Sequence, residues 1–203
     1  MAKRTTHGMH MSSNGSATAL YRQVLGPAFD TLSPCLKAMH QGEKAQQWEG
    51  TANVSRGPGL VARLAANLFR FPKAGSDIPV TLTCSPEPGI ERWVRCFGEN
   101  TLATVQWVKQ EQGRIWLMER FGLATFALAL VIEGDTLLFV PTHWYLAGIP
   151  MPRALLPSGR SYEAEAAGAF CFNIEINMPL LGPIVTYTGR LWPCGAPSEA
   201  RDQ

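Results

Sequence analysis

From Ile78 to Trp192 the chain is a succession of short apolar or alternating segments separated by turn-forming residues. This pattern predicts about nine β-strands, at residues 78–85, 90–97, 101–110, 114–121, 123–133, 136–146, 160–166, 169–178 and 183–192. Nearly all the links are short and contain Gly, Asn or Pro. Such links join antiparallel neighbours, because a parallel crossover needs a dozen residues or more. A meander of this length rarely stays flat, so we expect it to curl or close.

The segment before this meander mixes helix and strand signals. Residues 18–42 predict one or two short helices, with Ser33-Pro34 as an N-cap followed by proline at the first helical position. Residues 47–55 alternate as a strand with one wet face, and residues 60–69 return to helical spacing. The fold class that we predict is α+β, mainly β: a strongly curved antiparallel meander sheet or partial barrel with N-terminal helices packed on it.

Length and composition favour one globular domain at residues 18–194, flanked by disordered segments at 1–17 and 195–203. The 203 residues are 46% hydrophobic and 17% charged, with a net charge of +2. No basic run is interleaved with aromatic residues, so we expect no nucleic-acid partner. The longest uncharged apolar run, Phe121–Ile132, is too short to cross a bilayer, and the N-terminus lacks the apolar core of a secretory signal.

The five cysteines are an odd number with no CxxC spacing, which indicates a reducing compartment and predicts a cytoplasmic protein. The chain has no HExxH or paired-cysteine spacing, so we expect no metal site. It also has no GxGxxG motif after a strand, and we expect no cofactor.

The one long link of the meander is Leu146–Pro157, which reads LAGIPMPRALLP. Its three prolines cannot sit in a central strand, because each lacks the ladder N–H and has a fixed φ. It is nevertheless too apolar to be left in water. We expect it to form a lid or rim over a pocket, or a plug in the core.

The hairpin that turns at Gly134-Asp135 predicts two unequal sheet faces. One face is thick and apolar: Phe126, Leu128, Leu130 and Ile132 beside Leu137, Phe139, Pro141 and His143. The other carries smaller or mildly polar groups around one tryptophan: Thr125, Ala127, Ala129, Val140, Thr142 and Trp144. We expect the thick face to be core. The thin face either lines a cavity or packs closely against a helix.

Several segments resemble a known family. They are LYRQVLGPAFDTLSP, GLVARLAANLFRFP, MERFG with the apolar strand after it, and WYLAGIPMPRALLP. Together they are similar to an uncharacterised bacterial family, domain of unknown function 4166, from about Leu20 to Trp192. The resemblance implies a shared fold and no defined activity. It also implies that relatives occur fused to NAD-binding reductase-like modules, so a reductase-like protein is a candidate partner.

No catalytic constellation is evident in the sequence. His143 titrates near neutral pH and is the best single candidate for acid–base chemistry, although a structural histidine is the ordinary interpretation. A hairpin at Ala167-Gly168 places Glu175 opposite Arg160 and Asn173 opposite Tyr162, either as a surface ion pair or as a polar patch inside a cup. Arg153 either clamps a backbone carbonyl or Glu119, or recognises an anion at the rim of an apolar pocket.

Three functions follow from these observations. The first is a non-enzymatic module that binds an apolar or amphipathic small molecule. Its candidate ligand-binding residues are His143, Trp144, Tyr145, Met151 and Arg153. The second is an interaction or accessory domain that docks a reductase-like partner through an exposed apolar patch. The third is an enzyme that uses His143 or Glu175, which needs a carboxylate or nucleophile within hydrogen-bond reach.

Overall fold

The structure is a computed structural model that describes residues 19–195. The predicted disordered segments, 1–17 and 195–203, lie outside the described residues except for Gly195. Within the described part, three short helical segments precede the first strand, and one helix follows it. They are α1 (Leu20–Leu25), the 3-10 helix η1 (Gly26–Thr31), α2 (Pro34–His40) and α3 (Leu60–Leu68).

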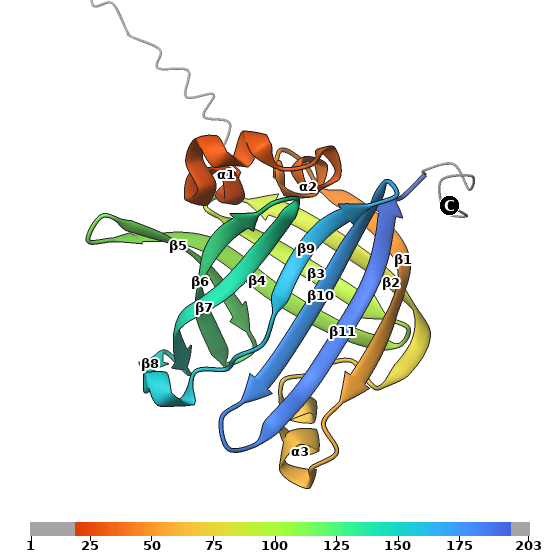
Figure 1. The fold of residues 1–203 in the computed structure, drawn as a ribbon, viewed down its shortest axis with the longest axis vertical. Coiled ribbons are helices and arrows are strands. Elements are labelled where there is room, and N and C mark those ends of the chain that lie inside the picture. Colours follow the sequence, from red (N-terminus) through yellow and green to blue (C-terminus); the bar gives the residue numbers. More distant parts are fainter. Residues whose placement is uncertain (1–18, 196–203) are drawn as a thin grey trace, which may run out of the picture.

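The strands follow in an up-and-down order (Figure 1). They are β1 (Gln46–Arg56), β2 (Gly75–Glu87), β3 (Ile90–Phe97), β4 (Asn100–Glu111), β5 (Arg114–Phe121), β6 (Ala124–Glu133), β7 (Thr136–Leu146), β8 (Ile149–Pro150), β9 (Ser161–Ala166), β10 (Ala169–Met178) and β11 (Gly182–Pro193). A second 3-10 helix, η2 (Arg153–Leu155), lies between β8 and β9.

The sheet closes into a barrel. Its strand order is β6-β5-β4-β3-β2-β1-β11-β10-β9-β7-β8, and the additional pairing of β6 with β7 completes the ring. Every paired neighbour is antiparallel. The predicted mainly β fold with N-terminal helices is confirmed. The expected partial barrel of about nine strands is in fact a closed ring of ten, and β8 pairs with β7 outside the ring.

β1 lies between the two ends of the meander and is part of the closed ring. We predicted a strand at 47–55 but placed it outside the meander. In the structure it pairs with β2 on one edge and with β11 on the other. Gly50 permits this approach, because a Cβ there would collide with the backbone carbonyl of Arg190. β1 therefore joins the last strand of the meander, β11, to its first strand, β2.

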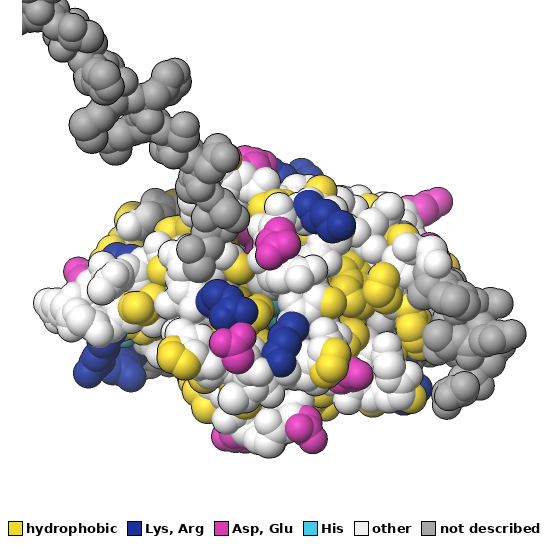
Figure 2. All heavy atoms as spheres, turned by 90° about the horizontal axis from the view of Figure 1, so that it is seen from above, with side chains coloured by type: hydrophobic (Ala, Val, Ile, Leu, Met, Phe, Trp, Pro, Cys, Tyr) yellow, Lys and Arg dark blue, Asp and Glu magenta, His cyan; other side chains and the backbone are white. Residues whose placement is uncertain are grey.

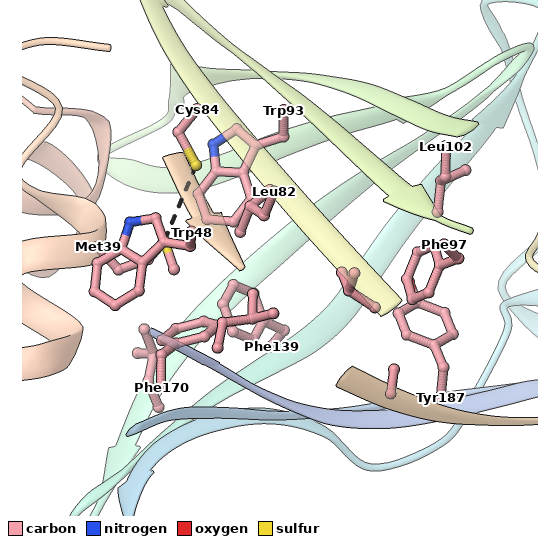
Figure 3. Packing of buried hydrophobic residues seen from close by; sticks show 14 of the residues in the cluster. Met39, Trp48, Leu82, Cys84, Trp93, Phe97, Leu102, Phe139, Phe170 and Tyr187 are labelled. Carbon is pink, nitrogen blue, oxygen red and sulfur yellow. Dashed lines mark hydrogen bonds between the residues drawn. The ribbon is translucent and has the colours of Figure 1, made fainter. Parts of the chain in front are cut away.

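The inward positions of the strands form one hydrophobic core (Figure 3). Trp48, Cys84 and Trp93 lie near the sulfur of Met39, which comes from α2. Phe97 of β3 and Tyr187 of β11 meet edge to face, with ring centroids 5.5 Å apart. Period-two alternation thus places large side chains inside the barrel from strands far apart in the sequence.

Different helices cover the two ends of the barrel (Figure 1). At one end α1, η1 and α2 form a cap. The predicted N-cap is confirmed, since the Ser33 hydroxyl accepts a hydrogen bond from the Leu36 N–H at 3.4 Å. At the other end α3 packs through Ala62 and Ala66, which are buried.

A β-bulge between β6 and β7 changes part of the predicted pairing. Leu128 faces Pro141 as expected, but Ala127 faces His143 and Phe126 faces Trp144. Thr142 is the extra residue, and its hydroxyl donates to the Ala127 carbonyl at 2.9 Å. Pro141 has no N–H for the ladder, and bulges are the usual place where a strand tolerates such a residue. The predicted positions of His143 and Trp144 are therefore exchanged: Trp144 is buried and His143 is exposed.

Candidate functional site

The barrel encloses a cavity between the cap and the link that joins β7 to β9. The space that the centre of a water molecule can occupy there is about 90 Å³, several times the roughly 10–15 Å³ that one water requires. Two kinds of side chain line it. The polar ones are Tyr21, Arg95, Gln106, Glu119, Glu163 and Tyr187. The apolar ones include Phe121, Phe126, Leu128, Phe139, Ile174 and Ile176.

An arginine and a glutamate form the centre of the polar part. Arg95 points inward from β3, and its Nη2 lies 3.8 Å from Oε1 of Glu119 on β5. Its Nη1 donates to the Thr104 hydroxyl of β4 at 3.1 Å. The guanidinium also lies over the Trp93 ring, 4.9 Å from its centroid, a distance at which cation–π attraction operates. Three adjacent strands therefore fix the orientation of Arg95.

The cap contributes an aromatic stack that reaches this cluster. Tyr21 of α1 and His40 of α2 are both fully buried, and their rings stack 3.7 Å apart. His40 in turn lies against Trp93, with centroids 5.6 Å apart. His40 Nε2 and Glu163 Oε2 are joined by a hydrogen bond of 2.6 Å. The histidine thus connects the cap to β9 beside the cavity.

Burial controls the protonation of the cluster. Removal from water raises the pKa of Glu119, and Arg95 opposes this rise only in part. Burial likewise raises the pKa of Glu91, although His40 acts against it. Burial raises the pKa of Tyr187 to about 12. Of the residues that line the cavity, Glu119 and Tyr187 are therefore shifted toward their neutral forms.

Three oxygens of the cavity lining lack hydrogen-bond partners among the described residues. They are Oε1 of Glu119, Oε1 of Gln106 and the hydroxyl of Tyr21. A buried polar atom without a partner costs free energy, and native structures usually satisfy it with protein or a bound molecule. The polar part of the cavity is therefore suited to a polar group that forms hydrogen bonds with these oxygens.

The cavity opens where β7 and β9 separate. These strands pair only over Thr136–Phe139 and Ser161–Ala164. Beyond that point the chain between them forms the rim, in which Pro157, Ser158 and Gly159 line the cavity. The rim is held to β10 by reciprocal backbone hydrogen bonds of 2.8 Å and 2.7 Å between Ser158 and Asn177. Ser158 is exposed, which places the opening at this rim.

The comparisons with known proteins identify a family. The model of a family described as domain of unknown function DUF4166 matches residues 32–191. The chain belongs to the DUF4166 family. This confirms the resemblance seen in the sequence. Searches among curated proteins and among solved structures each returned no match.

The family match covers β1–β10 and all of the cavity lining except Tyr21. The DUF4166 domain therefore contains the arginine–glutamate cluster and the rim, whereas α1 precedes the matched region. Within the described residues, no helix is long and apolar enough to cross a lipid bilayer. The described part also holds no group of three His, Cys, Asp or Glu side chains arranged to bind a metal ion.

Two of the predicted ligand-binding residues, Trp144 and Met151, secure the long link. Trp144 is buried and stacks on Phe126 of the cavity wall, with centroids 6.3 Å apart. Its indole N–H donates to the Pro152 carbonyl at 3.3 Å, and the Met151 N–H donates to the Trp144 carbonyl at 3.0 Å. Of the predicted Leu146–Pro157 segment, Pro157 is the residue that reaches the cavity lining.

The other three predicted residues lie outside the cavity lining. His143 and Tyr145 share a depression on the outer face of the barrel with Trp116 and Lys109. His143 Nδ1 lies 3.1 Å from the Thr142 hydroxyl. Arg153 is exposed on η2, and the Glu119 that we considered as its partner pairs with Arg95 instead. The structure does not bring these five residues together in one site.

The predicted polar group around Glu175 is placed at the rim. Asn173 faces Tyr162 as expected. Glu175 accepts hydrogen bonds from the Arg160 backbone N–H at 3.2 Å and from Asn177 at 2.7 Å. The guanidinium of Arg160 is directed elsewhere, with its Nη2 3.9 Å from Glu133. The expected side-chain ion pair is therefore replaced by a backbone contact.

Sequence reasoning missed the buried charged residues. Glu91, Arg95, Glu119 and Glu163 all occupy inward strand positions, where alternation normally places apolar residues. A signal was present in β3, because Glu91 and Arg95 share their face with Trp93 and Phe97. The opposite face of the same strand carries Arg92 among apolar residues. Because both faces therefore mix charged and apolar side chains, the hydrophobic pattern alone does not reveal which face points inward.

Proposed function

We propose that this DUF4166 domain binds an amphipathic small molecule inside its barrel. The observation that carries the proposal is the composition of one cavity, which combines an apolar wall of Phe126, Leu128 and Phe139 with a polar end at Arg95 and Glu119. Ligand pockets are typically apolar with a few convergent polar groups. The molecule enters at the rim, Pro157–Gly159, and places its polar group at the inner end.

The charges favour a polar group that donates hydrogen bonds rather than an anion. Arg95 is the cation of the cavity lining, and Glu119 already lies beside its guanidinium. Glu163 adds further acidic character on the same lining. A carboxylate ligand would lose its hydration in this site, where burial already disfavours the charged form of Glu119. An alcohol or amine would instead donate a hydrogen bond to Oε1 of Glu119 or of Gln106, which lack one.

The two alternative functions rest on other parts of the surface. An accessory domain needs an exposed apolar patch, and such a patch lies around α3, away from the polar end of the cavity. An enzyme that uses His143 would act in the outer depression, and one that uses Glu175 would act at the rim. The cavity favours ligand binding, because buried polar atoms without hydrogen-bond partners meet an apolar wall there.

Two experiments test the proposal. Organic extraction of the purified protein followed by mass spectrometry is expected to recover an amphipathic molecule in stoichiometric amount. Isothermal titration with octanol, octylamine and octanoate is expected to show binding of the alcohol and amine and weaker binding of the carboxylate. The absence of both a recovered molecule and any binding would overturn the proposal.

A pair of isosteric variants localises the binding. Glu119→Gln replaces one of the free acceptors with a weaker one while keeping the side-chain shape, and we expect about tenfold weaker binding of octylamine. Glu111→Gln is the matched control on the outer face, and it should bind like the parent protein. Equal affinity of the two variants would place the binding site outside this cavity.

A further inference from the structure

Most of the exposed large apolar side chains gather at one end of the barrel. Four lie on α3: Leu60, Val61, Leu64 and Leu68. Leu180 and Leu181 form the tip of the β10–β11 hairpin beside it, and Ile149 belongs to β8 at the same end (Figure 1). Leu123 lies next to β8, since its carbonyl accepts a hydrogen bond from the Ala147 N–H at 2.8 Å. Leu180 is 96% exposed and Leu60 is 81% exposed. Scattered apolar side chains need no explanation, but a concentration of them marks an interaction surface.

The outward position of these leucines follows from how α3 is held. The helix packs inward through the small residues Ala62 and Ala66. At its C-terminal end, Arg56 donates hydrogen bonds to the Pro72 carbonyl at 2.8 Å and to the Asn67 side chain at 2.7 Å. A helix fixed by its alanine face presents the leucines on its opposite face to solvent. The packing of α3 on the barrel therefore keeps Leu60, Leu64 and Leu68 exposed.

The charge of this segment is one-sided. Between Glu49 and Asp77 the chain contains no acidic residue, whereas it contains four basic ones. Three of these, Arg63, Arg70 and Lys73, are exposed on α3 or directly after it. A protein partner requires no particular sign of charge. Leucines flanked by exposed basic residues match the surface of a bilayer that contains anionic lipids.

We propose that the α3 end of the barrel docks on an anionic lipid surface. The leucines of α3 and of the β10–β11 tip enter the interface between headgroups and acyl chains. Arg63, Arg70 and Lys73 lie against the phosphates. The occupant is a lipid surface of negative charge, and the contact is interfacial.

The docking surface lies next to the cavity. Phe71, which follows α3, contacts Phe121 of the cavity lining with ring centroids 6.4 Å apart. On the other side, Ile176 of the lining precedes the hairpin tip by only a few residues on β10. A lipid surface bound here faces the end of the barrel at which the cavity opens. Docking does not depend on the proposed ligand, and its test is independent of ligand binding.

Co-sedimentation with vesicles tests the proposal on the full chain. We expect the protein to sediment with vesicles of phosphatidylcholine mixed with phosphatidylglycerol, and far less with phosphatidylcholine alone. Each exposed leucine that is replaced by serine is expected to weaken partitioning by about tenfold, so Leu60→Ser, Leu64→Ser and Leu68→Ser combined should abolish it. Arg63→Glu with Lys73→Glu should remove the preference for anionic vesicles, and added salt should weaken binding of the parent protein.

Matched controls separate docking from unfolding. Ile115→Ser and Val140→Ser change exposed apolar residues elsewhere on the barrel and should leave vesicle binding unchanged. Circular dichroism should show that all variants keep the parent fold. The proposal is wrong if the parent protein fails to bind anionic vesicles. It is also wrong if the leucine variant binds as well as the parent, or if the leucines instead mediate concentration-dependent self-association without vesicle binding.

Discussion

The two ends of this barrel differ in how their helices are held and in the side chains that they expose. At the cap end, buried polar contacts fasten the helices to the strands: Glu163 reaches His40, and Glu165 accepts a hydrogen bond from the Cys35 N–H at 2.8 Å. Seen from above, the cap surface carries acidic and basic side chains side by side (Figure 2). At the α3 end, the helix packs through alanines and turns its leucines to solvent, and the charged residues of α3 and of the segment up to Lys73 are all basic.

From this difference we infer that the two ends have separate roles. α2 is held at its first turn by Glu165 and at its last residue by Glu163, so the cap closes the barrel and buries Tyr21 and His40. The α3 end leaves apolar surface uncovered beside the cavity opening. Stability should therefore depend on the cap, and interactions with other molecules should depend on the α3 end. Four substitutions test this division.

The His40–Glu163 contact should dominate the stability of the cap. Glu163→Ala leaves the buried imidazole without its hydrogen-bond partner, and loss of one member of such a buried pair costs about 3 kcal/mol or more. Urea denaturation followed by circular dichroism measures the loss. Glu133→Ala is the matched control, because that glutamate is exposed and pairs with Arg160 at 3.9 Å; its cost should be at most about 1 kcal/mol. Equal losses in the two variants would contradict the assigned role of the cap.

The contact at the first turn of α2 should have a smaller effect. Glu165→Ala removes the acceptor for the Cys35 N–H, and loss of a capping interaction of this kind costs about 1 kcal/mol. The same denaturation experiment measures it, with Glu99→Ala in the exposed β3–β4 turn as the control. If Glu165→Ala is as stable as Glu99→Ala, α2 does not need this contact.

The buried carboxyl of Glu91 should make stability depend on pH. Its folded-state pKa is raised above the ordinary 4.5 by burial, so the unfolded chain releases this proton at a lower pH than the folded protein. The free energy of unfolding therefore falls as pH increases above 4.5. Glu91→Gln removes this contribution, and the variant should gain stability relative to the parent as pH rises. Denaturation across a pH series checks the sign, with the exposed Glu87→Gln as control. A constant difference between Glu91→Gln and the parent at all pH values would refute it.

The exposed leucines should contribute least to stability. Leu64→Ser is expected to change the free energy of unfolding by less than about 0.5 kcal/mol, as is usual for a surface position. Leu36 in α2 is fully buried, and Leu36→Ala should cost about 2–5 kcal/mol. Thermal unfolding of the two variants compares the two ends directly. A large loss of unfolding free energy in Leu64→Ser would mean that the outer face of α3 stabilises the fold, and would contradict this division.

The strand pattern predicted most of the fold. The short links and the period of two specified an antiparallel meander, and the Gly134-Asp135 hairpin was correct from Ile132–Leu137 to Leu128–Pro141. The predicted pairing of this hairpin failed at Thr142, where one extra residue reversed the orientation of every later side chain on β7. A bulge leaves almost no signal beyond Pro141, so a sequence pattern alone carries the alternation straight through it.

The candidate site was less predictable than the fold. Arg95, Glu119 and Glu163 lie on strands far apart in the chain, and only closure of the barrel brings them to one cavity. Each charge by itself resembles an ordinary surface residue of an alternating strand. Their meeting depends on β1, which joins the two edges of the meander through β2 and β11. The residues of the long link Leu146–Pro157 were more conspicuous in the sequence, yet the one that reaches the cavity lining is Pro157, which is buried.

Nuclear magnetic resonance spectroscopy tests the central claim most directly. During titration of the isotopically labelled protein with octylamine, we expect saturable shifts of the Arg95 side-chain N–H signals and of the methyl signals of Leu128. We expect no saturable shift of signals from His143 or from the leucines of α3. Saturable shifts confined to His143 or to α3, with Arg95 and Leu128 unchanged, would contradict the claim that the barrel interior is the binding site.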